Sequence, residues 1–348
     1  MDGAPRVTPL PTVLPAPTHA PLRGGPTLRW GVLAPGEIAN DWVATVHANT
    51  DQRVVAVASR TAARAEEFAA RHGIPRSYGG YEQLVADPEV DIVYVAAPHS
   101  EHPRLALLAI AAGKHVLVEK PMAVSQAAAG QILDAAAGAG VFAMEAMWSR
   151  FLPQTTVIAR LLSDGVLGTP RSASADFGGV FPFDPASRAF DPVLGGGALL
   201  DVGVYSLWFT DFALGPSTSV VARGSLASTG VDEQAMVLTE HAGAALGVAT
   251  SSMVATTPHS AVVSGDAARI EVDRSFWSPG GFALRTHDAE LRWTDPSNIR
   301  GRGGLCYQAT AVAAHVAAGR TEAPEHPHAT TLRVLGVIDE ARAQVGAT

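Results

Sequence analysis

A lysine stands directly after an apolar segment in the first half of the chain. Residues 115–118 read His-Val-Leu-Val, which is typical of a buried parallel strand, and Glu119, Lys120 and Pro121 follow at once. The whole chain contains only two lysines against twenty-three arginines. An ammonium group can lower the pKa of a nearby hydroxyl or give up a proton, whereas a guanidinium stays protonated. Lys120 is therefore a candidate for proton chemistry, and an incidental surface lysine is the alternative.

A carboxylate and a phenol stand four residues apart in the second half of the chain. Three glycines at 195–197 precede an apolar segment that we expect to be helical from about Ala198. On a helix, Asp201 and Tyr205 share one face, so the pair could anchor a substrate and donate a proton to it. This spacing is common by chance, and the pair gains weight only beside Lys120.

A nucleotide-binding turn is predicted where the first strand meets the first helix. Glycines in such turns let the backbone approach a pyrophosphate at the helix N-terminus. Only the middle glycine is kept here, in the turn Ala34, Pro35, Gly36, Glu37 and Ile38. A tight turn without a ligand is the alternative, and the strand–helix alternation that follows favours nucleotide binding.

The residues expected at the cofactor's ribose indicate its type. About twenty residues after the turn, an NAD enzyme usually has an acidic residue that binds the ribose 2′-hydroxyl. This chain has Ser59 and Arg60 there, with Arg64 one helical turn later. A hydroxyl and guanidinium groups can bind a 2′-phosphate, so we predict NADP, with NAD possible. Two solvated arginines at a helix start are the alternative.

The elements that must position these residues change in kind near residue 148. Over 28–148, apolar strands alternate with helices, which predicts an α/β Rossmann domain with a doubly wound parallel sheet. Residues 149–348 predict an α+β domain with a large, mostly antiparallel open sheet, because short strands over 219–294 follow one another like an antiparallel meander. Two helices, around 305–318 and 329–345, close the chain, and the last can pack back on the Rossmann domain.

The composition argues against several other functions. The formal net charge is −8 with no basic run, so we expect no nucleic-acid or membrane partner, and no apolar run approaches the length of a membrane span. A single cysteine, Cys306, fits the reducing cytoplasm. The close histidine pair His326 and His328 flanks a proline and is read as a loop, so we expect no metal site. Residues 1–27 are rich in proline and predict a disordered, partly polyproline arm, or alternatively an arm that wraps a partner subunit.

These motifs together resemble a known family. "VLVEKPMA" after the loop Ala97-Pro98-His99, with the later pattern Asp201-x-Gly203-x-Tyr205, resembles the Gfo/Idh/MocA oxidoreductases. Within that family, "MEAMWSRFLP", "GGALLDVGVY" and "SRTAARAEEFAARHGIP" are similar to the branch of dimeric dihydrodiol dehydrogenases and NADP-dependent D-xylose dehydrogenases. The resemblance covers nearly everything from residue 28 onward.

The resemblance implies a mechanism and a set of site residues. Lys120 would be the catalytic lysine and Tyr205 the general acid/base, with Asp201 in the substrate site. Tyrosine replaces the histidine of inositol dehydrogenases, which makes an inositol substrate less expected, and the peptide bond before Pro121 is expected to be cis. The residues expected to contact the cofactor are Ala34, Pro35, Gly36, Glu37, Ile38, Ser59, Arg60, Arg64, Ala97, Pro98, His99, His102, Glu119, Lys120, Pro121, Trp148 and Arg150. Those expected to contact the substrate are Lys120, Trp148, Phe177, Asp201 and Tyr205.

The implied substrate is a sugar, such as an aldose, or a cyclic vicinal diol, which exchanges hydride with the nicotinamide. The second domain's sheet implies a homodimer or homotetramer. Two other functions stay open at this point: a redox-type glycosidase that retains NAD, and a non-catalytic regulator that binds NAD(P).

Overall fold

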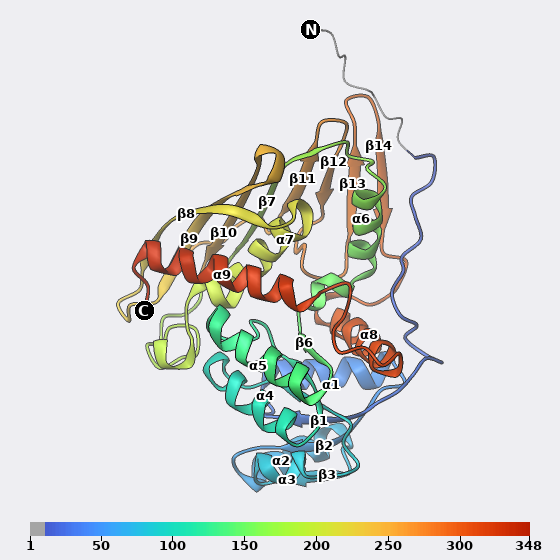
Figure 1. The fold of residues 1–348 in the computed structure, drawn as a ribbon, viewed down its shortest axis with the longest axis vertical. Coiled ribbons are helices and arrows are strands. Elements are labelled where there is room, and N and C mark those ends of the chain that lie inside the picture. Colours follow the sequence, from blue (N-terminus) through green and yellow to red (C-terminus); the bar gives the residue numbers. More distant parts are fainter. Residues whose placement is uncertain (1–10) are drawn as a thin grey trace. The chain divides into compact units, whose positions relative to one another are not determined.

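The chain forms two compact units in the computed structural model, which describes residues 11–348. One unit comprises His19–Phe151 and Gly301–Leu332, and the other comprises Leu152–Arg300, Arg333–Thr348 and the described residues up to Thr18. The predicted boundary at residue 148 lies close to the first division. The prediction differs from the structure near the C-terminus, because residues 301–332 belong with the Rossmann strands and the final residues do not (Figure 1).

The first unit contains a six-stranded parallel sheet in the order β3-β2-β1-β4-β5-β6, which confirms the doubly wound prediction. Its strands are β1 (Arg29–Leu33), β2 (Arg53–Ala58), β3 (Arg76–Tyr78), β4 (Ile92–Val95), β5 (His115–Val118) and β6 (Ala143–Glu145). Its helices are α1 (Glu37–Asn49), α2 (Ala62–His72), α3 (Tyr81–Val85), α4 (His102–Ala111), α5 (Gln126–Ala139) and α8 (Cys306–Ala317), with short helices η1 (His99–Glu101), η2 (Trp148–Phe151) and η6 (Gly301–Leu305). The short edge strand β3 was not predicted.

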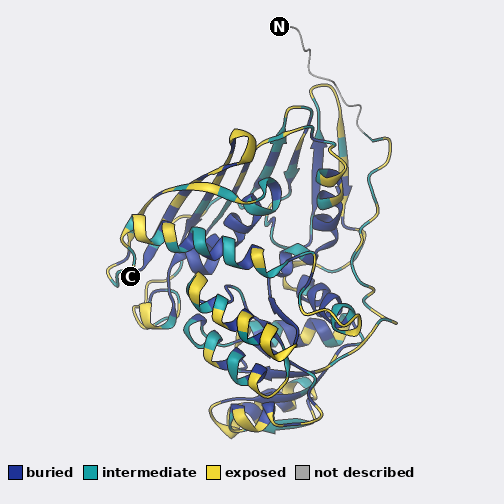
Figure 2. Cartoon of the chain, viewed as in Figure 1, coloured by how far each residue is buried: buried dark blue, intermediate teal, exposed yellow. Residues whose placement is uncertain are grey.

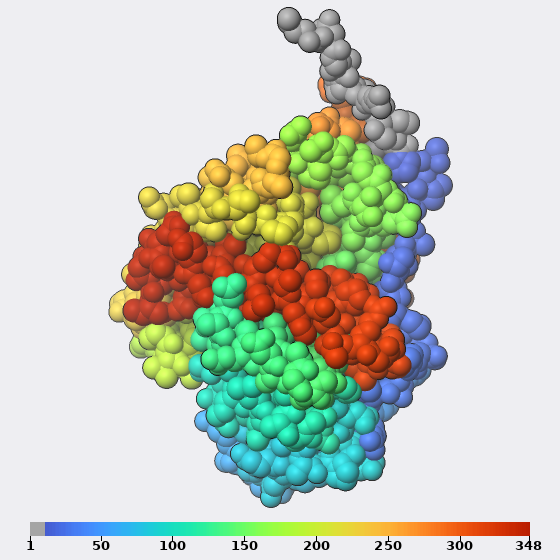
Figure 3. All heavy atoms as spheres, in the orientation of Figure 1, coloured from blue at the N-terminus to red at the C-terminus, as the bar shows by residue number. Residues whose placement is uncertain are grey.

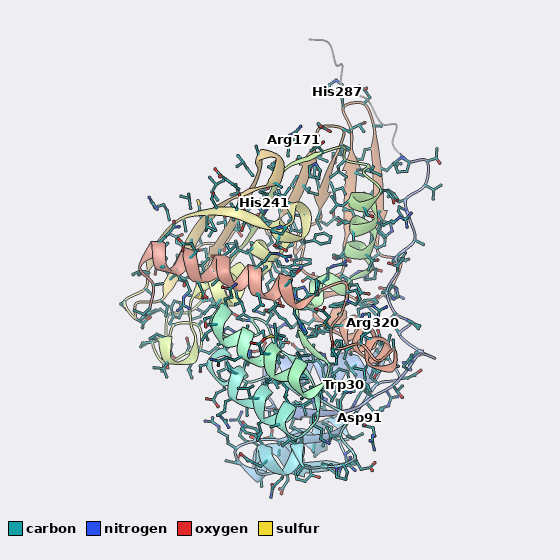
Figure 4. All side chains as sticks on the ribbon, in the orientation of Figure 1. Trp30, Asp91, Arg171, His241, His287 and Arg320 are labelled. Carbon is teal, nitrogen blue, oxygen red and sulfur yellow. The ribbon has the colours of Figure 1, made fainter. Side chains whose placement is uncertain are left out.

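Apolar burial holds this sheet between its helices. Every residue of β4 is buried, and α4 and α5 turn an exposed side outward and a buried side inward (Figure 2). The ring of Trp30 on β1 packs 4.9 Å from Trp42, which stacks 4.4 Å from Tyr94. Arg29, the first residue of β1, donates hydrogen bonds to Asp91, which directly precedes β4 (Figure 4 labels Trp30 and Asp91).

The second unit contains an eight-stranded sheet in the order β14-β13-β12-β11-β7-β10-β9-β8. Its strands are β7 (Pro170–Gly178), β8 (Ser217–Leu226), β9 (Asp232–His241), β10 (Ala245–Ser252), β11 (Ala261–Gly265), β12 (Arg269–Val272), β13 (Gly281–Arg285) and β14 (Glu290–Thr294). The mostly antiparallel open sheet is confirmed. The simple meander is wrong at one place, because β7 lies between β10 and β11 and runs parallel to β10.

Helices cover one face of this sheet. They are α6 (Pro153–Ser163), the π-helical turn η4 (Leu199–Gly203) continued by α7 (Val204–Leu214), and α9 (His328–Val345), which belongs to this unit from Arg333. Helix α7 packs on β7 and β10. The end of α9 lies at the surface beside β8, where Gln344 Nε2 donates to Val220 O at 2.8 Å (Figure 3). The segment Pro192–Leu214 has the length and hydropathy of a membrane-crossing helix, unlike our expectation, but 89% of its most apolar window is buried inside the protein.

The described part of the proline-rich arm, residues 11–27, has no helix or strand but is attached from Thr18 onward. Thr18 N donates to Thr156 Oγ1 at 3.0 Å. In the other unit, Gly24 N donates to Asp51 at 2.7 Å, and Arg23 pairs with the same carboxylate at 3.1 Å. The arm is therefore more ordered near the first strand than predicted, and residues 1–10 lie outside the described residues.

Candidate active site

The turn after β1 has the backbone geometry of an anion site. Gly36 precedes α1 as its N-cap and provides no side-chain cap, and a Cβ added there would meet no atom of residues 11–348 within 4 Å. The first helical bond runs from Asn40 N to Gly36 O, so the amides of residues 37–39 point out of the helix start. Ala34 adopts a left-handed φ of 61°, the conformation that a glycine would take without strain. The turn thus keeps the shape that fits a pyrophosphate although its first glycine is missing.

Three predicted segments meet at one edge of the parallel sheet. Leu33 on β1 pairs with Val95 on β4, which pairs with Val118 on β5, so the three carboxyl ends are level. The turn at 34–38, the loop at 97–99 and the turn at 119–121 follow these strands. The strand order reverses between β1 and β4, and doubly wound sheets bind ligands at this switch point.

An arginine that the sequence did not indicate lies beside the turn. Arg302 on η6 donates to Glu37 at 2.7 Å and to Asp41 at 2.5 Å. The hydrogen bond with Asp41 raises the pKa of Arg302, and Glu37 contributes in the same direction. Its charge offsets the Glu37 carboxylate, which would otherwise repel a phosphate at the helix start.

The predicted 2′-phosphate residues lie near further positive charge. Ser59 is buried, whereas Arg60 and Arg64 are exposed. Burial raises the pKa of Tyr81, and the charges of Arg60, Arg104 and Arg64 act against that shift. Arg104 also lies 5.8 Å from the centre of the Tyr81 ring. The charges of three guanidinium groups therefore act on one phenol, in a region where an anionic group would be attracted.

The Glu-Lys-Pro turn is held by buried side chains. The Lys120–Pro121 bond is cis, as expected. Glu119 is 5% exposed, accepts a hydrogen bond from Tyr94 Oη at 2.5 Å and accepts another from Lys120 N at 3.1 Å. The Glu119 carboxylate therefore forms hydrogen bonds inside the protein, whereas the Lys120 side chain is half-buried.

His102 differs from its predicted role. We expected it to contact the cofactor, but its ring is fully buried, with Nδ1 2.9 Å from Pro121 O and Nε2 2.8 Å from Ala97 O. Both ring nitrogens face backbone carbonyls inside the protein, and a neutral ring donates its one N–H to one of them, so a direct contact with the cofactor does not fit. Burial lowers the pKa of His102, although both carbonyls and the Glu145 carboxylate act in the opposite direction. The His99 ring lies 5.7 Å away and is 7% exposed.

A second buried group was also missed. Glu145 accepts from Met122 N at 2.9 Å, and its other oxygen lies 3.0 Å from His326 Nε2 and 3.0 Å from Thr331 Oγ1. Although burial opposes it, the hydrogen bonds and charge of His326 lower the pKa of Glu145. Among residues 11–348, no group of histidine, cysteine or acidic side chains has the arrangement of a metal site.

Trp148 and Arg150 lie on η2 of the same unit as Lys120. Trp148 is 4% exposed. Burial lowers the pKa of the Arg150 guanidinium, and the Glu325 carboxylate opposes this shift.

The predicted Asp201 and Tyr205 occupy the helix that follows the three glycines. The helix starts near Ala198 as expected, but its first turn is π-helical. Asp201 and Tyr205 are each 6% exposed, and Arg188 Nη1 lies 3.2 Å from Asp201 Oδ1. Gly197 has φ of 124°, where a side chain would also meet a buried carboxylate, so this close approach requires glycine.

Aromatic rings surround Tyr205. Phe177, which was predicted, stacks on Trp277 with ring centres 3.5 Å apart and planes 3° apart. Their centres lie 5.8 Å and 6.2 Å from the Tyr205 ring. His259 packs 4.8 Å from Trp277 and has a left-handed φ of 61°, and its amide donates to Asp176 at 2.7 Å. Trp277 and His259 were missed because their segments carry no sequence motif and are brought here by strand pairing.

The predicted residues form two half-sites. Lys120 and the nucleotide turn belong to one compact unit, and Phe177, Asp201 and Tyr205 belong to the other. Each half-site is assembled within its own unit, and their union in one pocket remains a prediction.

Comparisons with known proteins agree on the family. Residues 28–147 match the model of the "Oxidoreductase family, NAD-binding Rossmann fold", and residues 156–271 match the "GFO/IDH/MocA C-terminal domain". A trans-1,2-dihydrobenzene-1,2-diol dehydrogenase from Danio rerio is 38% identical over 92% of this chain and 97% of its own length. The chain belongs to the Gfo/Idh/MocA family.

Solved structures of other proteins share this Gfo/Idh/MocA fold. An aldose-aldose oxidoreductase from Caulobacter crescentus is similar with a TM-score of 0.82 and 25% identity, covering 91% of this chain and 97% of that one. A 3-ketoreductase from Actinomadura kijaniata, in complex with NADP and TDP-benzene, has a TM-score of 0.79 and 27% identity, covering 92% and 98%. As a Gfo/Idh/MocA protein, the chain is a sugar- or diol-type oxidoreductase with an NAD(P)-binding Rossmann domain.

Proposed function

We propose that the protein is an NADP-dependent dehydrogenase that transfers hydride between the nicotinamide and a CH–OH carbon of a sugar, such as an aldose, or a cyclic vicinal diol. The observation that carries this proposal is the position of Tyr205, a proton-exchanging group set against stacked aromatic rings. Rings of this kind pack against the apolar face of a cyclic substrate. The relatives named above are dihydrodiol and sugar oxidoreductases, which supports the same substrate class.

The residues divide the chemistry between them. When bound, the nicotinamide accepts or supplies the hydride. Tyr205 takes the proton of the substrate hydroxyl during oxidation and returns it during reduction. A free tyrosine is a poor base at neutral pH, since its pKa is near 10. The Lys120 ammonium stabilises the phenolate form, and Asp201, neutralised by Arg188, accepts a hydrogen bond from a second hydroxyl.

NADP is the proposed cofactor. The Gly36 turn and the amides of residues 37–39 fit a pyrophosphate, and Arg302 offsets the nearby Glu37 charge. Arg60 and Arg64 are exposed after β2, on the segment expected to contact the ribose, which supports a 2′-phosphate there.

Substitution of the two proton-handling residues tests the proposal. Tyr205→Phe and Lys120→Met should each lower kcat by roughly a hundredfold, the usual scale of acid–base assistance. Lys114→Met is a matched control, because Lys114 is the other lysine and its ammonium donates to two backbone carbonyls, at 2.8 Å each. Following NADPH absorbance over aldoses and cyclic diols gives the rates and separates net redox turnover from a glycosidase that retains its NAD. Near-wild-type turnover in either variant would remove that residue from the mechanism.

The proposal includes a homodimer or homotetramer formed through the second unit's sheet. The face of β8, β9 and β10 that α7 does not cover exposes five large apolar side chains, each at least 39% exposed. They are Val221, Met236, Leu238, Leu246 and Val248. A contiguous apolar face of this kind is typical of a protein interface. A cytoplasmic location also remains part of the proposal and rests on the single, buried cysteine.

A further inference from the structure

The backbone that carries Lys120 is bound on its C-terminal side by two buried side chains. His102 Nδ1 lies 2.9 Å from the carbonyl oxygen of Pro121, and Glu145 accepts a hydrogen bond from the amide of Met122 at 2.9 Å. Neither side chain is accessible to a substrate or cofactor, since the exposed fractions of His102 and Glu145 are 0% and 2%.

His102 also joins two loops of the cofactor edge. Its Nδ1 lies 2.9 Å from Pro121 O after β5, and its Nε2 lies 2.8 Å from Ala97 O after β4. A neutral imidazole donates its single N–H to one of these carbonyls and packs its other nitrogen against the second, so the buried ring fills the space between the two loops and holds them at a fixed separation.

Glu145 extends this connection to a distant segment of the same unit. One carboxylate oxygen holds Met122 N, and the other is shared by His326 and Thr331, both 2% exposed. A buried carboxylate with three hydrogen-bond partners has a fixed orientation, and losing one partner affects the others.

We infer that His102 and Glu145 are positioning residues: together they form a buried clamp that fixes the Glu119–Met122 turn and so sets the place of the Lys120 ammonium. The effect of the clamp on turnover rests on the proposed function, whereas its effect on the position of the Lys120 ammonium does not. Because a displacement of about 1 Å in a catalytic group can reduce a rate a hundredfold, loosening the clamp affects turnover without any contact to the substrate.

The test compares His102→Leu with His115→Leu. His115 is a matched control because it lies at the opposite end of β5, where its Nδ1 accepts from Phe142 N at 2.9 Å. We expect His102→Leu to lower kcat by roughly 10- to 100-fold. His115→Leu should reduce thermal stability but leave kcat near the wild-type value.

A second readout uses the scarcity of lysine. Acetic anhydride acetylates free amines, and mass spectrometry gives the ratio of the rates at Lys120 and Lys114 in one sample. We expect His102→Leu to change this ratio by at least about threefold, because it alters the surroundings of the Lys120 amine and not those of Lys114. If His102→Leu does not fold, Glu145→Gln is the second variant. It keeps an oxygen for Met122 N but loses the charge that binds His326, and it should change the acetylation ratio in the same way.

The outcomes separate the two proposals. A folded variant with unchanged kcat and an unchanged acetylation ratio would overturn the clamp. If the wild-type protein turns over no aldose or diol, the proposed function fails, and the acetylation ratio still decides whether the clamp exists.

Discussion

A buried carboxylate next to the Tyr205 helix makes a quantitative prediction about stability. Asp232 is 0% exposed, and one of its oxygens accepts from Leu199 N at 2.6 Å. The other oxygen has no hydrogen-bond partner among the described residues 11–348. Burial raises the pKa of Asp232 from 3.8 to about 6, although the Leu199 amide and the Arg342 charge act against the shift.

The direction of the effect follows from the two pKa values. The folded chain holds the Asp232 proton more tightly than the unfolded chain, so the stabilisation is complete below pH 3.8 and is lost as the pH rises through about 6. A shift of about two units corresponds to about 3 kcal/mol, of which about half is lost between pH 5 and pH 8. Asp232→Asn cannot ionise and keeps an oxygen for Leu199 N.

The assay is urea unfolding of both proteins from pH 5 to pH 8. The free energy of unfolding of the wild-type protein should fall relative to the variant by about 1.5 kcal/mol across this range. In Asp232→Asn, a side-chain amide hydrogen without an acceptor lowers the free energy of unfolding by about 1–3 kcal/mol at every pH. The quantity to compare is therefore how the free energy of unfolding of each protein changes with pH. Parallel pH profiles of the two proteins would refute the reasoning. Asp91→Asn is the control for loss of a carboxylate elsewhere, because Asp91 forms an ion pair with Arg29.

Three further predictions concern binding. Arg60→Ala should raise KM for NADP by about tenfold and leave KM for NAD unchanged, because one charge-assisted hydrogen bond is lost; an unchanged ratio of the two KM values would contradict the NADP assignment. Gly36→Val should weaken NADPH binding at least about tenfold in a fluorescence titration while the melting temperature stays near wild type, since a Cβ there meets no described protein atom within 4 Å; unaltered binding would place the pyrophosphate elsewhere. Leu238→Glu places a charge on the apolar sheet face and should convert the assembly to monomers in analytical ultracentrifugation, and an unchanged mass would exclude this face as the interface.

Local patterns predicted most of the fold. Alternating apolar strands and helices located nearly every element of the first unit, because its strands other than β3 are mostly buried, whereas no residue of the short edge strand β3 is. Gly73 follows an amphipathic segment in the sequence and does end α2, with φ of 66°. The glycines before Asp201 likewise preceded a helix as expected.

The failures share a physical cause, which is that they depend on partners distant in sequence. No local pattern shows that β7 inserts between β10 and β11, since that order depends on how the whole sheet closes. Arg302 and Trp277 carry no spacing signal, and the close pair His326 and His328 gives no sign of Glu145. All three contacts come from segments more than 60 residues away. We predicted a cofactor contact for His102, and its burial beneath the loops after β4 and β5 could not be read from its position in the chain.

The nucleotide-binding unit is finished by the part of the chain that is made late. Thr45 Oγ1 donates to Gly303 O at 2.7 Å, and Ala143 N donates to Thr321 O at 3.1 Å. Ribosomes add about 5–20 residues per second, so β1–β6 wait roughly 10–30 seconds for these contacts. During that interval the apolar surface that these contacts cover stays exposed. A gene fragment that stops at residue 300 would leave the sheet without these contacts.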